Sequence, residues 1–296
     1  MPWLQISIHT TQQHAEQTEN ILMENGACSV TLNDAADEPI LEPAPGETPI
    51  WQSIIVTGLF DETDQQEQLL TSISSALSGI DHQISSEILE DQNWTRSWMD
   101  DYHGMQFGER LWVCPWHIEP PDPEATNLRL DPGLAFGTGT HPTTSLCLRW
   151  LDQHIQRQNS LLDYGCGSGI LAIAALMLGV EQADGVDIDP QALEASLANA
   201  RANQVETRLH LFDTEQFAAI KGQQQYEIVV ANILSGPLVE LAPILAAHTL
   251  AGGDIVLSGI LAEQANSVIK AYTPYFEMDA PVFEDDWTQL HGCRRS

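Results

Sequence analysis

SLLDYGCGSGILAIAALMLG, residues 160–179, is the stretch that decides the fold of this chain. Its apolar start predicts a buried strand that ends at Asp163, and its apolar second half predicts a helix. Gly165, Gly167 and Gly169 lie between them. Glycines in such a turn allow a ligand to approach the bare backbone at the N-terminus of the helix. The stretch therefore predicts an α/β protein that holds a nucleotide or nucleoside at this turn.

The glycine spacing and two acidic residues indicate which ligand this turn holds. Dinucleotide-binding turns read G-x-G-x-x-G, whereas this turn reads G-x-G-x-G. The carboxylate of Asp163 would repel a pyrophosphate, but it would attract a ligand that carries a sulfonium and an ammonium group. Asp187 ends the next strand, about 20 residues beyond Gly165, where an acid can accept hydrogen bonds from ribose hydroxyls. Gly165, Gly167 and Asp187 therefore predict a binding site for S-adenosyl-L-methionine.

Asn232 is the candidate catalytic residue. It follows the apolar strand Tyr226–Ala231, and ligands of open α/β sheets bind beyond the carboxyl ends of the strands. An amide carbonyl can accept a hydrogen bond from an incoming amine and so orient its lone pair toward a methyl group. A lone asparagine at this place is otherwise typical of a turn before a proline, here Pro237, and the sequence alone leaves both interpretations open.

The order of strands and helices predicts two domains. Strands and helices alternate from Leu161 onward, which is typical of a mostly parallel sheet with helices on both faces, and residues 111–296 are assigned to this larger domain. Residues 1–92 follow the order βαββαβ, which predicts a smaller α+β domain of the ferredoxin-like kind. The aromatic and polar segment between them has no clear period, so residues 93–110 are expected to be a linker.

The composition is strongly acidic. The 296 residues include 42 Asp and Glu against 11 Lys and Arg, for a formal net charge of −31. This balance argues against direct nucleic-acid binding and favours either a basic partner or a role of the charge in solubility alone. The five cysteines include no C-x-x-C pair, the histidines show no metal-ligand spacing, and no membrane span or signal peptide is evident. We expect a cytoplasmic monomer without a metal site.

Several longer motifs resemble one enzyme family. They are LAFGTGTHPTT (134–144), DYGCGSGILAIAA (163–175), GVDIDP (185–190), VVANILSGPL (229–238) and GGDIVLSGIL (252–261). Together they resemble the bacterial methyltransferases of large-subunit ribosomal protein eleven. The resemblance implies a Rossmann-like class I methyltransferase sheet of seven mostly parallel strands. It also implies multiple methylation of lysine ε-amines and an N-terminal α-amine, and substrate recognition by the N-terminal domain.

The resemblance places individual residues in the site. By motif, Thr144, Gly165, Asp187 and Asn232 fall on positions that contact the methyl donor, with Asn232 nearest the reacting amine. It also turns the loop 137–140 from an ordinary turn into part of the site. Where many amino-methyltransferases have N-P-P and an aromatic residue, this chain has Asn232-Ile233-Leu234, which lacks a stacking platform for a nucleobase. The alternatives are methylation of a nucleic acid or small molecule, and nucleoside binding without turnover; no general base is assigned.

Overall fold

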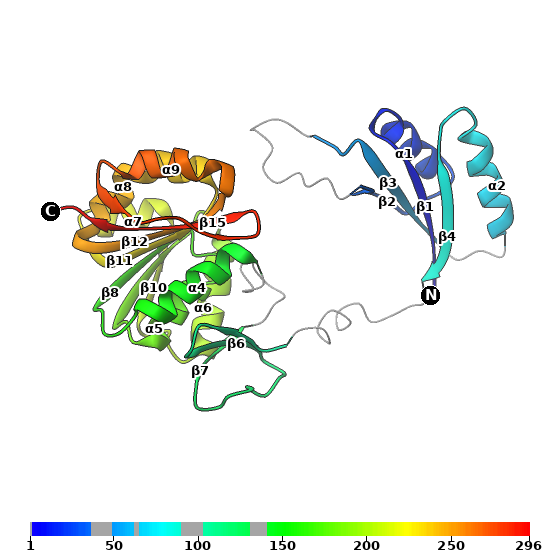
Figure 1. The fold of residues 1–296 in the computed structure, drawn as a ribbon. Helices are drawn as coiled ribbons and strands as arrows, with labels where there is room; N and C mark the ends of the chain where they lie inside the picture. Colours follow the sequence, from blue (N-terminus) through cyan, green and yellow to red (C-terminus); the bar gives the residue numbers. More distant parts are fainter. Residues whose placement is uncertain (1, 37–48, 62–64, 90–102, 131–140) are drawn as a thin grey trace. The chain divides into compact units, whose positions relative to one another are not determined.

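A computed structural model describes residues 2–36, 49–61, 65–89, 103–130 and 141–296. Contacts between residues divide the chain into two compact units, residues 1–101 and 102–296 (Figure 1). Among the described residues, no helix is long and apolar enough to span a membrane.

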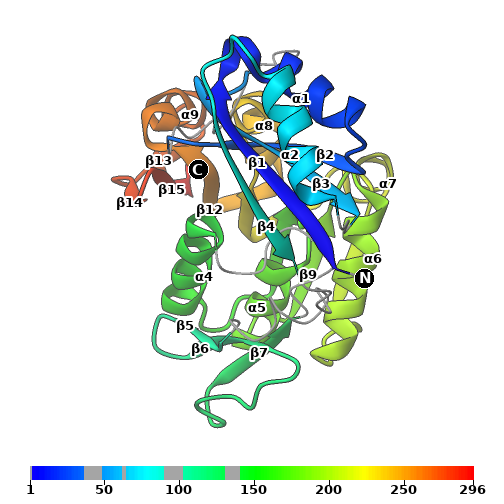
Figure 2. The same cartoon turned by 90° about the vertical axis from the view of Figure 1, so that its right-hand side faces the viewer.

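The N-terminal unit is a four-stranded antiparallel sheet with two helices on one face (Figure 2). Its elements follow the order βαββαβ: β1 (Trp3–Thr11), α1 (Ala15–Glu24), β2 (Ser29–Asp34), β3 (Ser53–Asp61), α2 (Gln66–Ala76) and β4 (Gln83–Leu89). The strand order β2-β3-β1-β4 is that of a ferredoxin-like sheet. Alternate residues such as Ile6 and Val56 are fully buried and pack with Leu22 and Ile73 of the helices. The period-2 pattern therefore turns one face of the sheet to the helices.

The main sheet of the second unit has the strand order β10-β9-β8-β11-β12-β15-β13, and β14 pairs with β15 outside this path. The strands are β8 (Ser160–Tyr164), β9 (Gln182–Val186), β10 (Leu209–Phe212), β11 (Tyr226–Asn232), β12 (Thr249–Leu261), β13 (Phe276–Met278), β14 (Val282–Glu284) and β15 (Trp287–Arg294). Strands β10, β9, β8, β11 and β12 are parallel, whereas β15 runs antiparallel to β12. The α/β class and the seven-strand path are as predicted, and the short β14 was not expected.

Helices cover both faces of this sheet (Figures 1 and 2). One layer holds α4 (Pro142–His154), α5 (Ile170–Leu178) and α6 (Pro190–Ala202), and the other holds α7 (Thr214–Lys221), α8 (Ser235–His248) and α9 (Ala265–Tyr272). Adjacent strand residues point into opposite cores: Leu161 packs with α4 and α5, and Leu162 with α8 and α9. Because both faces are covered, the central strands are largely apolar, and Asp163 on β8 and Asp184 on β9 are buried exceptions.

Part of the expected linker 93–110 belongs to the second unit. Strand β5 (Met105–Phe107) pairs with β6 (Leu111–Pro115), which pairs in parallel with β7 (Thr126–Leu130). The sequence shows no clear period here because β5 is too short to reveal one. Residues 93–102 lie outside the described residues.

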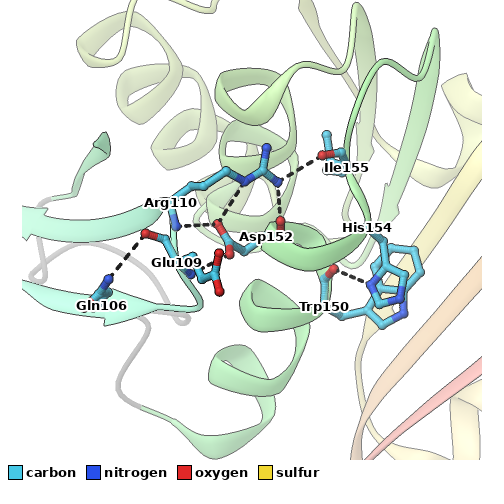
Figure 3. A network of polar contacts seen from close by, with 7 residues as sticks. All are labelled: Gln106, Glu109, Arg110, Trp150, Asp152, His154 and Ile155. Atoms are coloured by element: carbon cyan, nitrogen blue, oxygen red, sulfur yellow. Dashed lines mark hydrogen bonds and ion pairs between the residues drawn. The ribbon is translucent and has the colours of Figure 1, made fainter. Parts of the chain in front are cut away.

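A buried carboxylate fixes the turn between β5 and β6 onto helix α4 (Figure 3). Asp152 is 3% exposed and accepts hydrogen bonds from the backbone amides of Glu109 (2.7 Å) and Arg110 (3.1 Å). The Arg110 guanidinium lies beside the same carboxylate and also donates to the carbonyl of Ile155 at 3.0 Å. Gly108 has φ +78, and a β-carbon there would lie 2.1 Å from Asp152 Oδ2. The start of the second unit is therefore held rigidly against α4.

A histidine between two carboxylates also lies beside α4. His291 contacts Asp279 Oδ2 through Nδ1 (2.7 Å) and Asp254 Oδ1 through Nε2 (2.9 Å). Its ring lies 5.2 Å from that of Trp150 on α4. Burial lowers the pKa of His291, but the hydrogen bonds to Asp254 and Asp279 outweigh burial and raise it. The protonated form is therefore stabilised by folding.

The stability of the second unit is expected to depend on pH through His291. Because its pKa is raised by folding, its contribution is fully present below the unfolded pKa of about 6.5 and is lost as pH rises through the folded pKa. His291→Gln should cost about 1 kcal/mol at pH 6 and less at pH 9, measured by urea unfolding. His103→Gln, at an exposed site in the same unit, is the control; an equal cost of His291→Gln at both pH values would contradict the prediction.

Candidate functional site

The glycine turn lies at the carboxyl end of β8. Gly165, Gly167 and Gly169 have φ values of +81, +53 and +77, in the left-handed region that favours glycine. A β-carbon on Gly165 would lie 2.3 Å from Cγ2 of Ile233, the residue after β11. Gly165 N donates to the carbonyl of Val186 at the end of β9 (2.7 Å). The turn is thus packed between the ends of β9 and β11, and there is no room for a side chain at Gly165.

Two polar residues of α6 brace this turn. Ser196 Oγ donates to the carbonyl of Gly167 at 2.8 Å, and Asn199 Nδ2 donates to the carbonyl of Ser168 at 2.9 Å. Both side chains are buried. Neither residue belongs to the predicted site. Their spacing of three, which puts two polar residues on the buried face of one helix, is the sequence signal that could have indicated them.

Asp163 is fully buried beneath the turn. Its Oδ2 accepts a hydrogen bond from the amide of Ala172 at 3.1 Å, so it caps α5, whose N-cap residue Gly169 has no side chain. Its Oδ1 has no hydrogen-bond partner among the described residues. Burial, with a smaller contribution from the nearby charge of Asp187, raises the pKa of Asp163 to about 7 against the effect of the Ala172 amide. The sequence predicts a charged carboxylate, but burial leaves it partly protonated at neutral pH.

Asp187 faces the turn from the end of β9. Its Oδ2 accepts from Gly167 N at 2.8 Å and its Oδ1 from Asp189 N at 3.0 Å. A carboxylate oxygen has a second lone pair, so both oxygens can accept further hydrogen bonds from a ligand. Asp189 accepts from Gln191 N at 2.9 Å and is the N-cap residue of α6.

Asn232 and Thr144 meet at the carboxyl edge of the sheet. Asn232 Nδ2 donates to Thr144 Oγ1 at 3.2 Å, across 88 positions of sequence. Thr144 is 2% exposed in the first turn of α4, which is capped by His141. This bond fixes the amide plane and leaves its carbonyl oxygen as the group that can accept. The loop 137–140, expected to join the site, lies outside the described residues.

The backbone after Asn232 is confined from both sides. Gly259 of β12 has φ +81, and a β-carbon there would lie 2.3 Å from the carbonyl oxygen of Ile233. Ile233 therefore fits between Gly165 and Gly259. The five predicted site residues lie together at the ends of β8, β9 and β11 and the start of α4. Four of them form two hydrogen-bonded pairs, Gly167 with Asp187 and Thr144 with Asn232, and Gly165 lies between the pairs.

Comparison with known proteins agrees with this geometry. A family model described as ribosomal protein L11 methyltransferase (PrmA) matches residues 2–295. The chain belongs to the ribosomal protein L11 methyltransferase family. A ribosomal protein L11 methyltransferase of Marinobacter nauticus is 52% identical over 304 residues, covering 100% of this chain and 99% of the relative. That of Shewanella amazonensis is 49% identical over 298 residues and covers 100% of both chains.

A solved structure supports the same relationship. The crystal structure of a ribosomal protein L11 methylase from Lactobacillus delbrueckii subsp. bulgaricus is 31% identical, with a TM-score of 0.60. The match covers 66% of this chain and 100% of that one. As a family member, this chain is an S-adenosylmethionine-dependent methyltransferase of enzyme class EC 2.1.1. The predicted fold class, activity and cofactor are confirmed, and the roles of the single site residues stay predictions.

The structure of this L11 methyltransferase family member gives a physical reason for the Asn232-Ile233-Leu234 sequence. The branched side chain of Ile233 lies against Gly165, so it fills the space beneath the turn. Leu234 is 56% exposed at the following position. Aliphatic side chains therefore occupy the two positions after Asn232, where an aromatic stacking platform would otherwise lie.

Proposed function

We propose that this methyltransferase transfers methyl groups from S-adenosylmethionine to lysine ε-amines and the N-terminal α-amine of ribosomal protein L11. The observation that carries the proposal is the bond from Asn232 Nδ2 to Thr144 Oγ1 at 3.2 Å. With its nitrogen engaged, the amide presents its carbonyl oxygen to a donor. An amine that donates to this oxygen is held with its lone pair in a fixed direction, and such alignment is the main contribution to a displacement reaction.

The residues around the turn fit the methyl donor. The bare backbone at Gly165 and Gly167 allows close approach, and Asp187 has lone pairs left for ribose hydroxyls. Asp163 has one buried oxygen that finds no partner within the described part of the chain. When bound, S-adenosylmethionine supplies an electrophilic methyl group on a positively charged sulfur. Thr144 and Asn232 border the same edge of the sheet. We assign these residues to binding the donor, and Asn232 also to orienting the acceptor.

The acceptor must react as a neutral amine. A lysine with a pKa of about 10.4 is mostly protonated at neutral pH. A desolvated slot next to a positive charge lowers that pKa, so the amine can release its proton to water before it gains the methyl group. Because water can take the proton, we assign no described residue as a general base for this step.

The charge of the chain supports a basic protein as substrate. Residues 1–92, which we assign to substrate recognition, contain no lysine or arginine but many acidic residues. Such a surface attracts a basic partner and repels nucleic acid. We propose that residues 93–102 of the expected linker join this domain to the second unit, and that the enzyme works as a monomer in the cytoplasm, where its ribosomal substrate is made.

The proposal is tested with purified L11 and labelled S-adenosylmethionine. Intact-mass measurement of L11 should show increments of one methyl group, and peptide mapping should place them on lysines and the N-terminus. Label on ribosomal RNA instead of protein would contradict the proposal. Binding of the donor without any transfer would indicate a nucleoside-binding module.

Donor binding is expected to strengthen as pH rises. Asp163 has a raised pKa of about 7, and its ionised form favours a ligand with a sulfonium and an ammonium group. The ionised fraction rises about tenfold between pH 6 and pH 8, so the Kd should fall by up to about tenfold. Calorimetric titration at both pH values checks this. Asp163→Asn should bind more weakly and lose the pH dependence; an unchanged pH profile in that variant would rule out Asp163.

A further inference from the structure

The β14–β15 hairpin is fastened to the start of helix α4. The carboxylate of Glu284 accepts two hydrogen bonds from the Arg149 guanidinium, at 2.8 and 3.2 Å, and one from Ser145 Oγ at 3.3 Å. Glu284 is paired across the strands with Trp287. Directly opposite residues of an antiparallel pair point to the same face of the sheet. The hairpin therefore turns Trp287 toward α4.

Trp287 lies at the edge of the sheet that carries the site. Its ring meets that of His141 edge to face, with centroids 4.7 Å apart and an interplanar angle of 70°. His141 precedes Thr144 by three residues, so the two positions are neighbours on the first turn of α4. Trp287 is also paired with Leu261 at the carboxyl end of β12, and Asn232 is paired with Ser258 of the same strand. The indole therefore contacts His141, which lies one helical turn before Thr144, and Thr144 holds the amide of Asn232.

The surroundings of Trp287 suit a cation. Asp285 and Asp286 precede it and are exposed. The positive charge of Arg149 is paired with Glu284. Burial lowers the pKa of His141, which favours the neutral form of its ring. Trp287 is neither buried nor fully exposed and directly follows these two acidic residues in the chain. Aromatic rings attract cations such as ammonium groups, and carboxylates close to them in the chain add to this attraction.

We propose that Trp287, with Asp285 and Asp286, forms a subsite that binds the cationic amine of the acceptor before and between methyl transfers. This inference rests on the proposed function. An amine that has received one or two methyl groups is still mostly protonated at neutral pH, and its methyl groups add apolar surface that contacts an indole well. A subsite of this kind keeps a partly methylated amine close to Asn232, so that the next transfer follows before the substrate dissociates.

The test compares Trp287→Leu and Trp287→Phe with the wild-type enzyme. Leucine retains an apolar side chain but removes the aromatic face, whereas phenylalanine keeps it. Phe283→Leu is the matched control, because Phe283 lies on the same hairpin, is 54% exposed, and pairs with Thr288 rather than Trp287. For each variant, thermal unfolding, the Kd for S-adenosylmethionine, KM and kcat for L11, and the distribution of mono-, di- and trimethylated L11 are measured.

Trp287→Leu should raise KM for L11 by about twofold to thirtyfold, the range expected for a cation–π contact. It should leave the donor Kd unchanged and make mono- and dimethylated L11 accumulate, and Trp287→Phe should retain most of the wild-type behaviour. Unchanged KM and methylation states in Trp287→Leu would overturn the subsite, as would an equal effect of Phe283→Leu. Absence of any L11 methylation by the wild-type enzyme would instead contradict the proposed function.

Discussion

Replacing Asn232 with alanine is expected to lower kcat for L11 methylation by about 100-fold or more. Without the amide, an amine in the slot has no acceptor to fix its lone pair, and misplacement of about 1 Å can cost a factor of this size. The affinity for S-adenosylmethionine should fall much less, by about fivefold, because at most one hydrogen bond of about 1 kcal/mol is lost. Steady-state kinetics and calorimetric titration separate the two effects.

Thr144→Val is the companion variant for this prediction. Valine has nearly the shape of threonine but cannot accept the bond from Asn232 Nδ2. The amide stays present but is free to rotate, so kcat should fall by about tenfold, less than in Asn232→Ala. A kcat of Asn232→Ala within threefold of the wild-type value would contradict a role of the amide in orienting the amine.

Replacing Gly259 with alanine is expected to disturb both stability and activity. The new β-carbon would lie 2.3 Å from the carbonyl oxygen and 2.7 Å from the carbonyl carbon of Ile233. These are backbone atoms, so no rotamer change can relieve the overlap. A left-handed φ of +81 adds strain for a residue with a side chain. We expect a loss of about 2–5 kcal/mol in unfolding free energy, together with a lower kcat because Asn232 moves with Ile233.

Gly252→Ala provides the matched control on the same strand. Gly252 has φ +76, but a β-carbon there would meet no atom within 4 Å. It therefore carries the conformational strain without the overlap and should cost only about 1 kcal/mol with kcat unchanged. Urea unfolding and kinetics of both variants check this; equal effects of the two substitutions would show that φ alone, and not the contact with Ile233, is responsible.

The expected linker illustrates a limit of reading the chain from its sequence. Strand β5 has three residues, too few for a periodic pattern, and what holds its turn in place is Asp152, more than 40 positions away. Strand β14 also has only three residues, so its sequence shows no periodic pattern either. In contrast, the ferredoxin-like order of the N-terminal unit followed from strands and helices long enough to show their own periods.

By itself, the sequence determined the strand–turn–helix at 160–179, the α/β class, the donor and the position of Asn232. These depend on adjacent residues: apolar runs that form strands and helices, glycines required by left-handed φ, and acids at strand ends. Only the tertiary structure decided that Thr144 fixes the amide of Asn232, that Asp163 is partly protonated, and that Trp287 meets His141. These properties arise from burial and from contacts between distant residues, which leave no pattern in the local sequence.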